Sequence, residues 1–163
     1  MQVREPWWRR YAVMHEPYKA INGRAGEGPP LIVRWKLFSI SGLKVYLHRI
    51  CRPDDTPDYH DHPWPFWHKI LEGAYREELP GGRSRVLREG YTAFHRSGYA
   101  HRVADVCLPK DPMAGSGPIE TEAYFEDAWS LVVVGPRIRH WGFIDAVKGC
   151  WTPWERYTSG ERC

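Results

Sequence analysis

Residues 59–68 read YHDHPWPFWH and are the most informative part of the sequence. Side chains alternate between two faces on an extended backbone, so His60 and His62 are expected to point to the same side. Both imidazoles can then reach one metal ion. If the strand continued through the two prolines, Phe66 and His68 would share that side, although proline interrupts strand pairing.

A second informative stretch is residues 90–101, which read GYTAFHRSGYAH. Gly98 is typical of a turn between two strands, because glycine adopts backbone angles that other residues avoid. His101 follows this turn by three residues. A third histidine in such a position strengthens the prediction that the first pair binds a metal.

The two stretches resemble the cupin superfamily, whose first motif is G-x5-H-x-H-x3,4-E-x6-G and whose second is G-x5-P-x-G-x2-H-x3-N. The second motif is matched in its spacing by Gly90, Gly98 and His101, whereas Arg96 replaces its proline and Asp105 its asparagine.

The first motif is matched in part. Its histidine pair and closing glycine are present as His60, His62 and Gly73. Asp54 replaces the opening glycine, and Phe66 or Trp67 occupies the position of the metal-binding glutamate. The resemblance covers residues 54–105 by motif and residues 31–146 by the spacing of strands.

The resemblance implies an all-β jelly-roll barrel that holds a divalent metal ion through His60, His62 and His101. Three neutral imidazoles suit Fe(II), Ni(II), Cu(II), Zn(II) or Co(II) better than Mg(II) or Ca(II). Without the glutamate, the site would keep the full charge of the ion and favour an anionic, bidentate substrate.

Cupins with three histidines include the thiol dioxygenases and the diketone-cleaving dioxygenases, and residues 60–62 and 101–103 are similar to the corresponding thiol dioxygenase segments. Fe(II) is therefore the favoured ion, with Zn(II) or Ni(II) as alternatives. No cysteine lies near the glutamate position, so a Cys–Tyr crosslink is not indicated.

His68 is the candidate catalytic residue. It lies six positions past His62, and we expect it to hold or move a proton near neutral pH. A shift of register at the prolines would instead make it a fourth ligand.

Substrate-binding candidates are basic or aromatic. An extended segment over residues 135–143 places Arg137 and Arg139 on one face, where a guanidinium could bind a carboxylate or phosphate through two hydrogen bonds. A solvent-facing turn is the alternative for both. Further candidates beside the histidine motifs are Arg96, Trp64 and Tyr99, the last two also being typical core residues.

The chain divides into an arm and loop, residues 1–30, and a single β-domain, residues 31–163. Aromatic residues recur at helical spacing from Trp7 to Tyr18, which predicts a short arm over residues 1–20 that is helical or partly helical. Four hairpins are expected, over residues 31–40 with 43–50, 66–78 with 84–88, 91–95 with 100–106, and 129–134 with 141–146. The stretch between Cys107 and Ala128 is either an insertion or a lid.

Composition limits the partners that the chain can be expected to bind. A net charge of +3 in 163 residues gives no strong case for nucleic acid or membrane, so a small-molecule substrate is expected. The four cysteines form no C-x-x-C pair and are expected as free thiols. Without a signal-like segment or a long apolar run, a cytoplasmic location is expected, and the aromatic arm would suit a homodimer contact.

Three functions fit the sequence. The first is a mononuclear non-haem Fe(II) dioxygenase that acts on a small anionic molecule. The second is an oxygen-independent isomerase or lyase, in which the metal acts only as a Lewis acid. The third is a non-enzymatic cupin that binds a small molecule.

Overall fold

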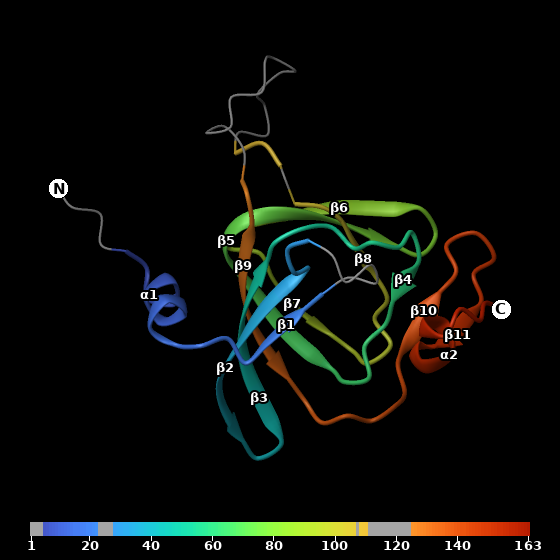
Figure 1. Cartoon of the computed structure of the whole chain (residues 1–163), viewed down its shortest axis with the longest axis horizontal. Coiled ribbons are helices and arrows are strands. Elements are labelled where there is room, and N and C mark those ends of the chain that lie inside the picture. Colours follow the sequence, from blue (N-terminus) through green and yellow to red (C-terminus); the bar gives the residue numbers. More distant parts are fainter. Residues whose placement is uncertain (1–4, 23–27, 107, 111–124) are drawn as a thin grey trace.

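The structure is a computed structural model that describes residues 5–22, 28–106, 108–110 and 125–163. Antiparallel strands curl around an interior, with one helix at each end of the chain (Figure 1). The elements in chain order are α1 (Trp7–Met14), β1 (Lys19–Ile21), β2 (Ile32–Ile40), β3 (Leu43–Ile50), β4 (Tyr59–His60), β5 (Phe66–Leu79), β6 (Arg83–Arg88), β7 (Thr92–His95), β8 (Arg102–Asp105), β9 (Ala128–Val134), β10 (Gly142–Ile144), β11 (Trp151–Pro153) and α2 (Trp154–Thr158).

The long strand β5 organises the larger sheet. This sheet runs β1-β2-β3-β9-β5-β6, and β7 and β8 also pair with β5. The first part of β5 pairs with β7 and its second part with β6 and β8. The register with β9 shifts between Ile70 and Glu72. Such irregularities bend and twist a strand, so β5 can serve both walls of the barrel.

A smaller sheet, β11-β10-β4, completes the wall that carries the first histidine motif. Phe143 of β10 pairs with His60 of β4. A single antiparallel bridge between His60 and His101 then connects this sheet to the residue that precedes β8.

Alternation along the strands separates the interior from the outer cores. On β3, Tyr46 and His48 line the barrel cavity. Leu47 points the other way and packs with Trp35 and Trp129 beneath residues of α1. A further core cluster closes the interior and includes Ile50, Ile70, Tyr75, Leu87 and Val103.

The predicted all-β jelly-roll architecture is confirmed, as are the first two hairpins. Strands β2 and β3 meet at Ser41 and Gly42, which both have positive φ angles (46° and 82°), as a two-residue turn between twisted strands requires. Strands β5 and β6 meet across residues 80–82.

The other two predicted hairpins are wrong. Strands β7 and β8 do not pair with each other, because each lies against a different part of β5. Strand β9 inserts between β3 and β5, whereas β10 pairs with β4 and β11. The turn residues near Gly98 and Gly135 therefore connect strands that cross between walls.

The predicted short helical arm is confirmed and is partly helical: the helix covers Trp7–Met14, and residues 19–21 form a strand that pairs with β2. Trp8 and Tyr11 pack on the core cluster of Trp35. Trp7 and Met14 are exposed. The predicted insertion after Cys107 lies largely outside the described residues.

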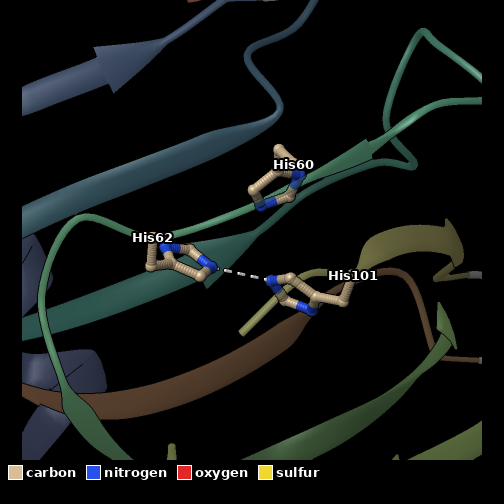
Figure 2. A group of neighbouring side chains, drawn as sticks. All are labelled: His60, His62 and His101. Carbon is tan, nitrogen blue, oxygen red and sulfur yellow. Dashed lines mark hydrogen bonds between the residues drawn. The ribbon is translucent and has the colours of Figure 1, made fainter. Parts of the chain in front are cut away.

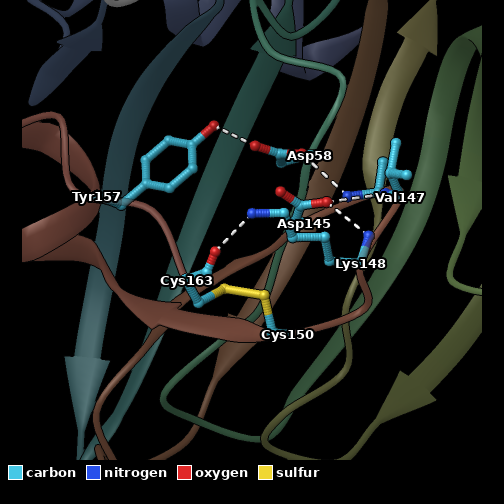
Figure 3. Close-up of a disulfide and its surroundings, with 8 residues drawn as sticks. Asp58, Asp145, Val147, Lys148, Cys150, Tyr157 and Cys163 are labelled. Atoms are coloured by element: carbon cyan, nitrogen blue, oxygen red, sulfur yellow. Dashed lines mark hydrogen bonds between the residues drawn. A yellow bond between two sulfur atoms is a disulfide. The ribbon is translucent and has the colours of Figure 1, made fainter.

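The cysteines differ from the predicted free thiols, because Cys150 and Cys163 form a disulfide. Figure 3 shows this bond beside the turn where Asp145 accepts hydrogen bonds from the backbone of Val147 and Lys148. Cys51 is a free, half-buried thiol whose pKa is raised by burial. Disulfides persist mainly in oxidising compartments, so the bond does not support the predicted cytoplasmic location.

In the part of the chain that the structure describes, no helix is long and apolar enough to cross a membrane.

Gly73, the closing glycine of the first motif, is predicted to be intolerant of substitution. Its φ angle is 81°, and a Cβ atom would lie 2.3 Å from the backbone oxygen of Asp127. We expect Gly73→Ala to lower the free energy of unfolding by about 3 kcal/mol, because backbone strain and a clash add together. Urea denaturation measures the change.

Gly81→Ala is the matched control, since Gly81 also has a positive φ angle but no atom within 4 Å of an added Cβ. We expect it to cost about 1 kcal/mol. Equal losses for the two variants would contradict the assigned contact.

Candidate metal centre

Two of the three predicted ligands are fixed to each other by backbone hydrogen bonds. The His60 amide donates to the His101 carbonyl at 2.9 Å, and the His101 amide donates to the His60 carbonyl at 3.0 Å. The neighbouring Asp54 amide donates to the Val103 carbonyl at 2.9 Å. Residues 41 positions apart are therefore held in register by the main chain rather than by a metal.

The three imidazoles converge on one point (Figure 2). One nitrogen from each of His60, His62 and His101 lies within 4.8 Å of the other two. Nε2 of His62 lies 3.0 Å from Nε2 of His101. Two nitrogens bound about 2.1 Å from one ion at a right angle are separated by about 3.0 Å, so this donor set fits a divalent transition metal.

Carboxylates behind the rings set which nitrogens face that point. His101 donates from Nδ1 to Oε2 of Glu77 at 2.7 Å, and Nδ1 of His60 lies 3.4 Å from Oδ2 of Asp54. A proton held on Nδ1 leaves Nε2 as the lone-pair donor, which is the form that binds a metal.

Glu77 is the central residue that the sequence did not reveal. It is 1% exposed and accepts hydrogen bonds from His101, from Arg85 at 2.6 Å and from Tyr99 at 2.9 Å. Burial opposes ionisation, but the hydrogen bond from His101, with those from Arg85 and Tyr99, outweighs it and lowers the pKa of Glu77 to about 2. Its carboxylate is therefore charged. The irregular register of β5 leaves no spacing signal that links it to the motif.

The ligand imidazoles differ in their affinity for protons. Burial strongly lowers the pKa of His62, and the neighbouring His101 adds to the effect. For His60, burial is outweighed by Asp54, so its pKa is raised. Burial lowers the pKa of His101, although Glu77 opposes the change. A metal must displace protons mainly from His60.

Asp61, between the first two histidines, points away from them as expected and anchors their segment. It is 3% exposed and accepts hydrogen bonds from the Gly142 amide at 2.7 Å, from Trp151 Nε1 at 3.1 Å and from the Arg139 guanidinium. Three contacts from the C-terminal part of the chain thus hold the His60–His62 segment from behind.

The cluster opens into a cavity of about 380 Å³. Phe66, at the position of the family's glutamate, lines it and lies beside His62, with 4.7 Å between the ring centres. The other side chains that line the cavity include Arg34, Lys44, Tyr46, His48, Trp64, His68, Tyr75, Ser130, Val132, Val134 and Arg137.

The fold resembles those of solved structures. EutQ of Clostridium difficile has a TM-score of 0.50 at 10% identity, over 77% of this chain and 83% of that one. This chain has the cupin fold. A double-stranded β-helix protein of Klebsiella pneumoniae has a TM-score of 0.49 at 15% identity, over 87% and 97% of the two chains. An RmlC-like cupin of Methanocaldococcus jannaschii has a TM-score of 0.45 at 13% identity, over 65% and 81%.

Sequence comparison adds nothing to this cupin assignment. No protein-family model matches the chain, and no curated protein matches it significantly.

The predicted substrate-binding residues are not all at the cavity. Trp64 and Arg137 line it. Arg139 is instead bonded to Asp61, and the Tyr99 hydroxyl donates to Glu77. Arg96 is exposed and does not line the cavity. Three further residues that line the cavity were not predicted, because strands β2 and β3 carry no motif. These residues are Arg34, Lys44 and His48.

His68 lines the cavity and is 6% exposed. Its Nε2 lies 3.4 Å from Nε2 of the equally buried His95. Burial, with a contribution from His95, lowers the pKa of His68 to about 4, and burial lowers the pKa of His95 to about 4 as well. Both rings are therefore neutral at pH 7. The sequence had instead predicted that His68 gains and loses a proton near neutral pH.

Glu77 is predicted to support metal binding through His101. We expect Glu77→Gln to weaken binding of Zn(II), as a probe metal, by about 10- to 100-fold, because the neutral amide polarises His101 less. Competition with a coloured chelator measures the affinity.

The matched control is Glu78→Gln, because the adjacent Glu78 pairs with Arg76 and Arg102 instead. It should leave the affinity unchanged. A similar loss in both variants would show that general destabilisation is the cause.

The buried pair His68 and His95 is predicted to make stability depend on pH. Their folded pKa values near 4 lie below the ordinary value of 6.5, so the unfolded chain binds more protons between these limits. Stability should therefore fall as pH drops from about 6.5 to about 4, by up to about 3 kcal/mol for each imidazole. Urea unfolding of the metal-free protein at a series of pH values measures this.

His68→Gln should flatten that dependence, whereas substitution of the exposed His140 by Gln should not. An unchanged slope in His68→Gln would contradict the assignment.

Proposed function

We propose that this cupin is a mononuclear non-haem Fe(II) dioxygenase that acts on a small anionic substrate. The observation that carries the proposal is the convergence of three imidazoles, with no carboxylate at the glutamate position, on a cavity that carries excess positive charge. Arg34, Lys44 and Arg137 line this cavity, whereas Asp54 is its lining carboxylate among the described residues.

The bound ion would supply a Lewis acid and a redox-active centre. His60, His62 and His101 would hold it, and Asp54 and Glu77 keep Nδ1 of two of these rings protonated. This pair of outer carboxylates also balances part of the ion's charge without occupying a coordination position.

The protein's own residues prepare the cavity for an anion. Phe66, Val132 and Val134 give the wall beside the histidines an apolar character, which strengthens electrostatic attraction by excluding water. His68, neutral at pH 7, lines the same cavity and can accept a hydrogen bond from a bound thiol or enol. These features fit a small substrate that carries negative charge.

The proposal predicts metal-dependent oxygen consumption. Protein purified without chelator should hold one iron per chain by elemental analysis and should consume O₂ with a member of a panel of thiol carboxylates and β-diketones. The double variant His60→Ala/His101→Ala should lose both the metal and the activity while its circular dichroism spectrum stays that of the wild type.

Turnover that continues without O₂ would favour the isomerase or lyase alternative. Full activity after metal removal would overturn a metal-dependent function altogether, and metal binding without turnover would favour the non-enzymatic alternative.

A further inference from the structure

Arg34 is a cation on the cavity wall that forms no ion pair with any residue that the structure describes. Arg34 lies on β2, where the register pairs it with His48 of β3, and both side chains line the cavity. The adjacent Trp35 packs into the outer core. Because side chains alternate along β2, Arg34 points into the cavity. A charged group there is stabilised by an opposite charge or by hydrogen bonds.

Arg34 uses only one of its donor groups. Nε donates to Nε2 of His48 at 2.9 Å. Among the described residues, no hydrogen bond involves its two terminal amino groups and no carboxylate forms an ion pair with it. Asp54, the carboxylate on the cavity, already accepts from the Val103 amide and pairs with His60.

The guanidinium is also fixed in orientation. Its carbon lies 4.9 Å from the centre of the Tyr46 ring, a cation–π distance. His48 accepts a hydrogen bond from Arg34, so it is the neutral acceptor and adds no charge, and burial strongly lowers its pKa. Burial lowers the pKa of Arg34 too, which reflects the missing counter-charge. A planar guanidinium held in this way is prepared for two parallel hydrogen bonds to an oxyanion.

The other cations on the cavity are less suited to this task. Lys44 and Arg137 are exposed, and Nε of Arg137 already donates to the Arg139 carbonyl at 3.3 Å. An anion at the cavity mouth would meet these two, whereas one that enters the cavity would reach Arg34.

We propose that Arg34, oriented by His48 and Tyr46, binds the anionic group of the substrate, a carboxylate or a phosphate monoester. This inference rests on the proposed function, because that function makes the bound anion part of a substrate. It implies a molecule with a metal-binding group at one end and an oxyanion at the other.

The test titrates metal-free protein with inorganic phosphate and, separately, with acetate, by isothermal calorimetry. At least one anion should bind at millimolar concentration, and the one that binds more tightly identifies the class. We expect Arg34→Gln to weaken this binding by at least about tenfold, because a hydrogen-bonded charge pair is lost.

Arg83→Gln is the matched control, because it removes one positive charge from an exposed position on β6. It should bind as the wild type does. Equal affinity in Arg34→Gln and the wild type, or no binding of either anion to the wild type, would overturn the proposal.

A second measurement needs no variant and so does not depend on the folding of Arg34→Gln. Phenylglyoxal modifies arginine side chains, and peptide mass spectrometry locates the sites. The binding anion should protect Arg34 but not Arg83, whereas equal modification of Arg34 with and without the anion would contradict its role. Because both measurements use metal-free protein, they are independent of whether iron or O₂ is used.

Discussion

The reciprocal pair of backbone hydrogen bonds between His60 and His101 is the constraint on which the site depends. It joins the small sheet to the residue that precedes β8 and brings two distant histidine motifs together. Because main-chain bonds set the separation of the two segments, the side chains need only the correct tautomer to converge. Folding of the chain and assembly of the ligand set are therefore coupled.

Charge around this bridge is arranged in layers. Three imidazoles face the centre, the carboxylates of Glu77 and Asp54 lie behind two of them, and Arg85 lies behind Glu77. On the cavity side, three cations (Arg34, Lys44 and Arg137) face one carboxylate, Asp54, among the described lining residues. Negative charge therefore supports the ligands, while the cavity keeps an excess of positive charge for an anion.

The sequence could predict the parts that depend on local chemistry. Glycine at a tight turn located the hairpin of β2 and β3, and the H-x-H alternation with the spacing of Gly98 and His101 located the three histidines. The pairing of β7, β8, β9 and β10 depends on how β5 bends, and no residue pattern in those strands encodes a partner. Glu77 was missed for the same reason, and Arg34 because an isolated arginine in a strand is ordinary until its surroundings are known. The bond between Cys150 and Cys163 likewise depends on how β11 and α2, which lie between the two cysteines, return the chain.

Asp61 has a broader consequence. Through it, residues 139, 142 and 151 fix the direction in which the neighbouring histidines point, although none of them is a ligand. The H-x-H motif is therefore not a transferable unit. If the segment were transferred to another barrel without residues 139, 142 and 151, the histidines would keep their spacing along the chain but not their orientation. Metal binding by this motif therefore depends on a C-terminal segment that does not itself resemble a metal motif.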